Sequence, residues 1–131
     1  MIYSLTFTSD GGIGVFSRSE NRIKNKWLDA IPSVSSHHIG FVVMSESRII
    51  GITTKFLFET PTESSVFKIY NSEQSKEPGH LLTSVNHPEG IKIKLNTSDE
   101  PISLKQGQMI SCFFKGEGYN PRLTLLIEMD D

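Results

Sequence analysis

The chain of 131 residues has a single cysteine, Cys112, and no long apolar run. One cysteine excludes an internal disulfide, and its place inside an apolar segment indicates a small core side chain rather than a reactive thiol. No stretch approaches the ~20 apolar residues that a membrane-spanning helix needs. The first residues have neither the basic start nor the apolar segment of a secretory signal. We therefore expect no membrane partner.

A strong excess of one charge is also lacking. Thirteen basic and fifteen acidic side chains give a formal net charge of −2. Nucleic-acid-binding domains are usually strongly basic, so the composition predicts no nucleic-acid partner. The length and the 37% hydrophobic content are those of one globular domain that can bury its own core.

Motifs for catalysis and metal binding are absent as well. His37 and His38 are adjacent, and on an extended chain they would point to opposite faces. His80 and His87 have no carboxylate or cysteine at the spacing of a zinc site. The segment 11–14 is glycine-rich but lacks the Lys-Ser/Thr pair of a phosphate-binding loop, and no Gly-x-Ser-x-Gly elbow occurs. The sequence predicts a protein that is not an enzyme and needs no metal or cofactor.

The chain is instead rich in short strand patterns. Apolar and polar residues alternate from Leu123 to Met129 and again from Ile50 to Phe58, with Ile50, Ile52 and Thr54 on one face. A period of two indicates strands half-buried on a sheet, and turn-forming segments such as Gly116-Glu-Gly118 separate the runs. Strands are expected near residues 2–8, 13–17, 25–28, 38–44, 48–58, 65–71, 79–85, 91–95, 108–115 and 121–129. This spacing predicts an all-β fold, an antiparallel β-sandwich or jelly roll, in which the last strand completes a sheet.

The N-terminal part of the chain differs from the rest. Residues 9–37 are polar, with a cluster of basic side chains just before Trp27. We divide the single globular domain into an N-terminal strand with an arm or loop region, 1–24, and a sandwich, 25–131. The basic side chains are candidate contacts for an acidic partner surface: Arg18, Arg22, Lys24 and Lys26.

Four apolar residues lie on the opposite face from the main alternation of their strands. They are Leu57, Val66, Phe114 and Leu126. Exposed together, they would form a larger apolar patch than monomers normally carry. They are therefore candidates for a subunit interface or for burial beneath the N-terminal arm. The alternative is that they face the second sheet.

From Trp27 onward, the order of these features resembles small β-sandwich modules of tailed-bacteriophage virions, which occur in capsid decoration (cement) proteins, head fibres and tail-fibre tips. The resemblance covers about residues 25–129. It departs from the usual pattern at Met44, where proline is common, and at Gln108, where aspartate is common. The matching segments are Ile39-Gly-Phe-Val-Val-Met44, Arg48-Ile-Ile-Gly-Ile-Thr53, Phe67-Lys-Ile-Tyr70, Leu104-Lys-Gln-Gly-Gln-Met-Ile-Ser-Cys-Phe-Phe-Lys-Gly116 and Asn120-Pro-Arg-Leu-Thr-Leu-Leu-Ile127.

The resemblance implies a non-enzymatic structural protein of the virion, assembled in the host cytoplasm. The expected function is capsid decoration, on the outer surface of a phage head, by a homotrimer whose partner is the major capsid protein or another virion protein. The basic residues would pair with acidic capsid loops. The alternative is a carbohydrate- or receptor-binding tail-fibre module that uses Tyr70 and Tyr119 as stacking platforms. A cupin-like enzyme is disfavoured, because the metal ligands of that class are missing.

Overall fold

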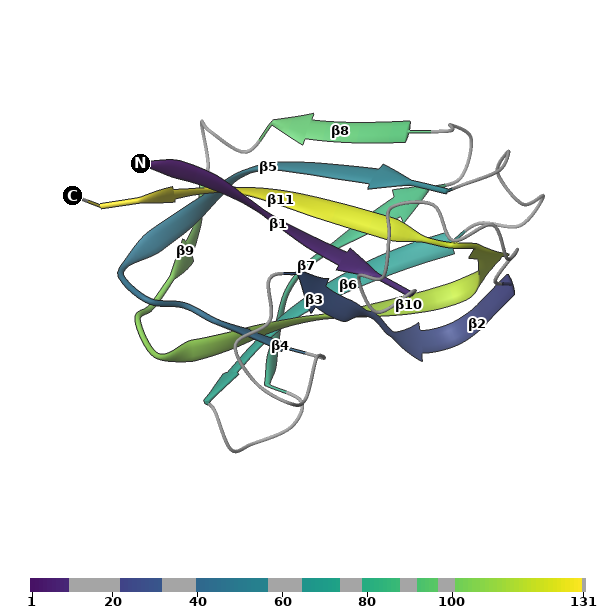
Figure 1. Cartoon of the computed structure of the whole chain (residues 1–131), viewed down its shortest axis with the longest axis horizontal. Coiled ribbons are helices and arrows are strands. Elements are labelled where there is room, and N and C mark those ends of the chain that lie inside the picture. Colours follow the sequence, from purple (N-terminus) through teal and green to yellow (C-terminus); the bar gives the residue numbers. More distant parts are fainter. Residues whose placement is uncertain are drawn as a thin grey trace.

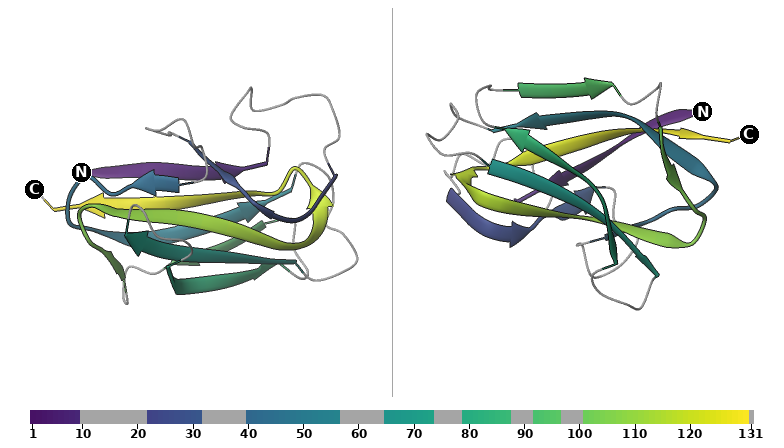
Figure 2. Two further views of the ribbon diagram at one scale, coloured as in Figure 1. Left: turned by 90° about the horizontal axis from the view of Figure 1, so that it is seen from below. Right: turned by 180° about the vertical axis from the view of Figure 1, so that it is seen from behind.

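The computed structural model shows two antiparallel β-sheets packed face to face (Figure 1). It describes residues 1–9, 22–31, 40–56, 65–73, 79–87, 92–96 and 101–130, and this part of the chain contains strands and no helix. The two further views in Figure 2 show the sheets as separate layers. The all-β sandwich predicted from the sequence is confirmed.

The six-stranded sheet, here called sheet A, has the order β3-β1-β11-β5-β8, with β9 also paired to β5. The five-stranded sheet, sheet B, has the order β2-β10-β6-β7, with β4 also paired to β10. The strands of sheet A are β1 (Ile2–Thr8), β3 (Asp29–Ile31), β5 (Ser47–Lys55), β8 (Lys92–Asn96), β9 (Ile102–Leu104) and β11 (Arg122–Met129). Those of sheet B are β2 (Arg22–Trp27), β4 (Gly40–Val42), β6 (Ser65–Glu73), β7 (His80–His87) and β10 (Gln108–Tyr119).

Strand pairing is nested along the chain. β1 pairs with β11, β2 with β10, β5 with β8, and β6 with β7, always antiparallel. This is the pairing that results when a long antiparallel hairpin folds over on itself, which is the topology of a jelly roll. As expected, β11 lies inside its sheet, between β1 and β5 (Figure 1). Because β1 also lies inside sheet A, between β3 and β11, the predicted boundary at residue 25 does not separate this strand from the sandwich.

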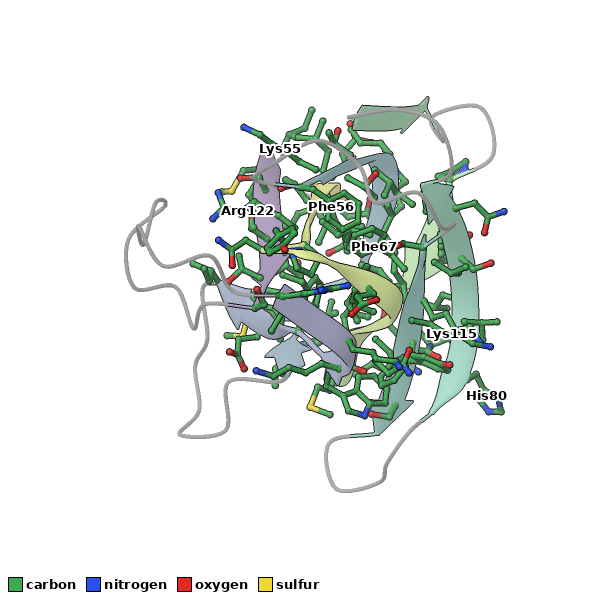
Figure 3. The ribbon with its side chains drawn as sticks, turned by 90° about the vertical axis from the view of Figure 1, so that its right-hand side faces the viewer. Lys55, Phe56, Phe67, His80, Lys115 and Arg122 are labelled. Carbon is green, nitrogen blue, oxygen red and sulfur yellow. The ribbon has the colours of Figure 1, made fainter. Side chains whose placement is uncertain are left out.

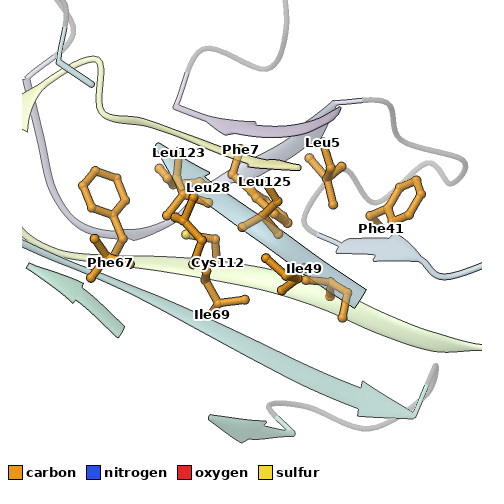
Figure 4. Close-up of a cluster of buried hydrophobic side chains, with 14 of the residues drawn as sticks. Leu5, Phe7, Leu28, Phe41, Ile49, Phe67, Ile69, Cys112, Leu123 and Leu125 are labelled. Atoms are coloured by element: carbon orange, nitrogen blue, oxygen red, sulfur yellow. The ribbon is translucent and has the colours of Figure 1, made fainter. Parts of the chain in front are cut away.

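The core fills the space between the sheets (Figure 4). Leu123, Leu125 and Ile127 of β11 have no exposed area, so the predicted alternation of this strand is confirmed. Sheet B contributes every second residue of β10 and β6, namely Ile110, Cys112, Phe114, Phe67 and Ile69, which are also fully buried. Burial of this kind stabilises a folded chain by about 1.5–3 kcal/mol for each large apolar side chain.

The alternation predicted for β5 is wrong at Ile50. The register of β5 against β11 shifts so that Ile49 and Gly51 have successive partners and Ile50 has none. Such a β-bulge inserts one residue and reverses the faces on either side of it. Ile49 and Ile52 are therefore both buried, whereas Ile50 is partly exposed.

The predicted turn at Gly116-Glu-Gly118 is also wrong. β10 continues through it to Tyr119, and Gly116 has a φ of 128° within a bulge. The chain leaves sheet B at Asn120, whose φ of 44° lies in the left-handed region. β9 was not predicted at all, and the strand expected at 13–17 lies outside the described residues.

Candidate functional site: a basic pocket beside an aromatic cluster

Three of the four predicted basic contacts lie on β2, at the edge of sheet B. Arg22, Lys24 and Lys26 are exposed there, and Arg18 lies outside the described residues. Arg22 is already paired, because its Nε lies 2.8 Å from Oε1 of Glu117 on β10. Both side chains are substantially exposed, so this pair contributes little to stability.

Lys24 shares an open pocket with two lysines that the sequence did not single out. Lys68 of β6 and Lys115 of β10 line the same hollow, which has a volume of about 470 Å³. We call it the basic pocket; its other lining residues are Asn25, Val66, Gly116 and Glu117. Within the described residues, none of the three lysines forms an ion pair. Figure 3 shows Lys115 on the sheet B side of the core, away from Lys55 and Arg122 of sheet A.

The pocket lies at an irregular point of the β2–β10 pair. The register shifts between Phe114 and Glu117, and two residues with positive φ meet there, Asn25 at 45° and Gly116 at 128°. The side-chain Oδ1 of Asn25 accepts a hydrogen bond of 2.9 Å from the backbone N–H of Gly116. Asparagine and glycine are the residues that tolerate this conformation best. A β-bulge changes the direction in which neighbouring side chains point. This bulge lies where Lys24 and Lys115 line the pocket.

An aromatic cluster adjoins the pocket. Trp27 of β2, Phe113 of β10 and Tyr70 of β6 form it, with ring centroids 5.1 Å apart for Trp27–Phe113 and 5.4 Å apart for Trp27–Tyr70. All three side chains are partly exposed. Phe113 lies on the outer face of sheet B, because its neighbours along β10 point into the core. Lys68 is the direct cross-strand partner of Phe113, so the cluster and the basic pocket form one continuous surface.

Of the four predicted interface residues, the three that the structure describes do not share a surface. Phe114 is fully buried and packs against Phe67 with centroids 5.1 Å apart, so for this residue the alternative, that it faces the second sheet, is confirmed. Val66 lines the basic pocket on sheet B. Leu126 lies on the outer face of sheet A and is 41% exposed. Leu57 lies outside the described residues.

Among the described residues, no group of three or more His, Cys, Asp or Glu is placed to hold a metal ion. Burial raises the pKa of the Cys112 thiol, so it stays neutral inside the sheet. No helix in this part of the chain is long and apolar enough to cross a bilayer. The outer face of sheet B carries cationic side chains and aromatic rings, which are groups that can bind a ligand.

Two of the pocket lysines were not predicted from the sequence as site residues. The alternation of β6 and β10 assigns Lys68 and Lys115 to outward faces, but outward lysines are ordinary. Only the pairing of β10 with both β2 and β6 brings Lys24, Lys68 and Lys115 together. Tyr70, predicted as a stacking residue, belongs to the aromatic cluster, whereas Tyr119 lies at the far end of β10 opposite Arg22.

No family model matches the chain, and comparisons with curated proteins and with solved structures also gave no match. The resemblance to virion modules therefore stays a prediction based on the sequence.

Proposed function

We propose that the chain is a non-enzymatic protein of a phage virion surface, a capsid decoration protein that attaches to an acidic part of the major capsid protein through the outer face of sheet B. The observation that carries this proposal is the concentration of positive charge there. In a chain with a net charge of −2, this face gathers Arg22 and Lys24 of β2, Lys68 of β6 and Lys115 of β10. A basic surface of this kind steers association with an acidic partner.

The opposite face of the sandwich supports the predicted self-association. Ile2 is 55% exposed and Leu126 is 41% exposed. The two residues are diagonal neighbours on the outer face of sheet A, because Leu126 is opposite Ser4 and Ile2 is opposite Glu128. Contact between copies through this face would leave every basic face free for the coat. A trimer would then gain affinity from simultaneous contacts without any new interaction.

Attachment is tested by co-sedimentation with undecorated capsids of the encoding phage. The wild-type chain should sediment with the capsids, and the double variant Lys68→Glu/Lys115→Glu should not. Lys105→Glu is the matched control, because Lys105 is exposed and precedes β10 at the end far from the pocket. Binding should also weaken with added salt, since exposed charges are screened. A wild-type chain that stays in the supernatant at low salt would contradict the proposal.

A carbohydrate-binding module is the second candidate, favoured by the partly exposed rings of Trp27 and Tyr70 beside lysines. A glycan array is the direct test of this candidate. Binding of a neutral glycan that survives Lys68→Glu but is lost on Tyr70→Ala would select it over capsid attachment.

A further inference from the structure

We infer that the basic pocket and the aromatic cluster together recognise one extended peptide segment, in which an acidic residue and a large apolar residue are separated by a single residue. The inference rests on the proposed function, because it names what the outer face of sheet B binds on an acidic protein partner. It assigns a carboxylate to the pocket and an apolar side chain to the rings.

The positive charge of the pocket favours a carboxylate as the ligand. Among its lining residues, Lys24, Lys68 and Lys115 are cationic and without an ion pair in the described part of the chain. The acidic lining residue, Glu117, forms an ion pair of 2.8 Å with Arg22. Because Arg22 balances the negative charge of Glu117, the positive charge of the lysines is not compensated. One exposed lysine–carboxylate pair is weak. Three ammonium groups around one carboxylate act as a network and bind it better.

The spacing between the basic pocket and the aromatic cluster favours an extended peptide as the ligand. Phe113 and Lys115 are two residues apart on β10, on the same face of the sheet. Same-face neighbours on a strand are about 6.6 Å apart, and residues i and i+2 of an extended ligand have the same spacing. A segment lying along β10 therefore places its acidic side chain by Lys115 while its apolar side chain reaches Phe113. Trp27 and Lys68 are the cross-strand neighbours of Phe113 that flank this path.

The ring geometry favours a peptide over a sugar. The planes of Trp27 and Phe113 are inclined by 72°, and those of Trp27 and Tyr70 by 57°. Rings inclined in this way, tilted for Trp27–Tyr70 and edge to face for Trp27–Phe113, present no common flat surface. A sugar ring stacks on a flat, open ring face, whereas a branched apolar side chain fits the uneven surface of tilted rings.

The test is an NMR titration of the whole ¹⁵N-labelled chain with three peptides. The probe is acetyl-Gly-Glu-Thr-Leu-Gly-amide, with one control that has glutamine in place of glutamate and another that has serine in place of leucine. The probe should shift the backbone amides of Lys115 and Gly116 and the indole N–H of Trp27, and the shifts should saturate. Each control should bind about fivefold more weakly or worse, since each lacks one of the two recognised groups.

Variants of the chain sharpen the test. Lys68→Met and Lys115→Met keep the aliphatic stems and should each weaken probe binding about two- to fivefold. Lys105→Met, far from the pocket, should leave it unchanged. Equal binding of the glutamate and glutamine peptides would overturn the inference, as would the absence of any shift at millimolar probe.

Oligogalacturonate is the competing probe, because it carries carboxylates on sugar rings. Shifts at the same residues with oligogalacturonate but not with the peptide would overturn the inference in favour of an acidic saccharide. The two proposals fail separately. If capsid binding is lost on Lys68→Glu/Lys115→Glu while the peptides do not bind, the proposed function stands and the peptide inference is wrong.

Discussion

Replacement of Phe114 by alanine should destabilise the isolated monomer severely. The Phe114 ring has no exposed area, and it packs between Phe67, with centroids 5.1 Å apart, and Phe56, with centroids 5.8 Å apart. Truncating a buried phenylalanine costs about 3–5 kcal/mol, from lost transfer energy and from the cavity that remains. The ring contacts account for about 0.5–1.5 kcal/mol of that cost. Since domains are stable by only about 5–15 kcal/mol, this substitution removes a large share of the total.

The measurement is urea unfolding followed by the fluorescence of Trp27, the only tryptophan, at two protein concentrations. Leu126→Ala is the matched comparison, because Leu126 is 41% exposed on the outside of sheet A. In the monomer, Leu126→Ala should lower the free energy of unfolding by about 1 kcal/mol or less. Phe114→Leu, which keeps most of the apolar volume, should lower the free energy of unfolding by about 1–2 kcal/mol. This variant still tests the packing if the alanine variant does not fold.

Concentration dependence separates a core residue from an interface residue. The cost of Phe114→Ala should be the same at both protein concentrations, because the two sheets of one chain bury the ring. If Leu126 lies in a contact between copies, its substitution should matter more at the higher concentration. A loss of less than about 1 kcal/mol for Phe114→Ala, or a loss that depends on concentration, would refute the packing described for this residue.

Three further predictions concern single groups. In Gly118→Ala, the added Cβ would lie 2.4 Å from Cε1 of the buried Phe56 ring, so denaturant unfolding should show a loss of about 1–3 kcal/mol. The Cys112 thiol should resist a thiol reagent in the native chain and react once the chain is unfolded, because burial raises its pKa and blocks access. Burial also raises the pKa of Tyr3, an effect that its hydrogen bond with Ser47 only partly opposes. The unfolded chain therefore releases this proton first, and stability should fall as the pH rises through about 10. A Tyr3→Phe variant should show a smaller fall.

Most strands were predictable because alternation in the sequence reflects burial directly. The face of β11 that carries Leu123 and Leu125 is an example, since period two leaves only one way to bury both. The segment around Ile50 was not predictable in the same way. Ile49, Ile50 and Ile52 are all apolar, so two registers are equally consistent with the sequence. The pairing with β11 decides between them by excluding Ile50 from the ladder.

The interpretation of Gly116-Glu-Gly118 failed for a related reason. A glycine with positive φ serves a turn or a bulge equally well, and the sequence signal is the same for both. Here Gly116 takes part in a bulge that keeps β10 paired with β2, while the chain turns later, at Asn120. The sequence therefore marked an irregularity correctly but not its kind, because the kind depends on which strand lies alongside.

The candidate site was predictable only in part, because it is made by three strands that are distant along the chain. Lys24 drew attention within its basic cluster, whereas Lys68 and Lys115 had to be found through the nested pairing of the jelly roll. That pairing also explains why the site is fixed in place. A one-residue slip of β10 would carry Lys115 and Phe113 into the core and expose Phe114. Burial of Phe114 between the sheets opposes the slip, so the core contact that holds the two sheets together also holds the pocket lysine and the neighbouring aromatic ring on the outer face.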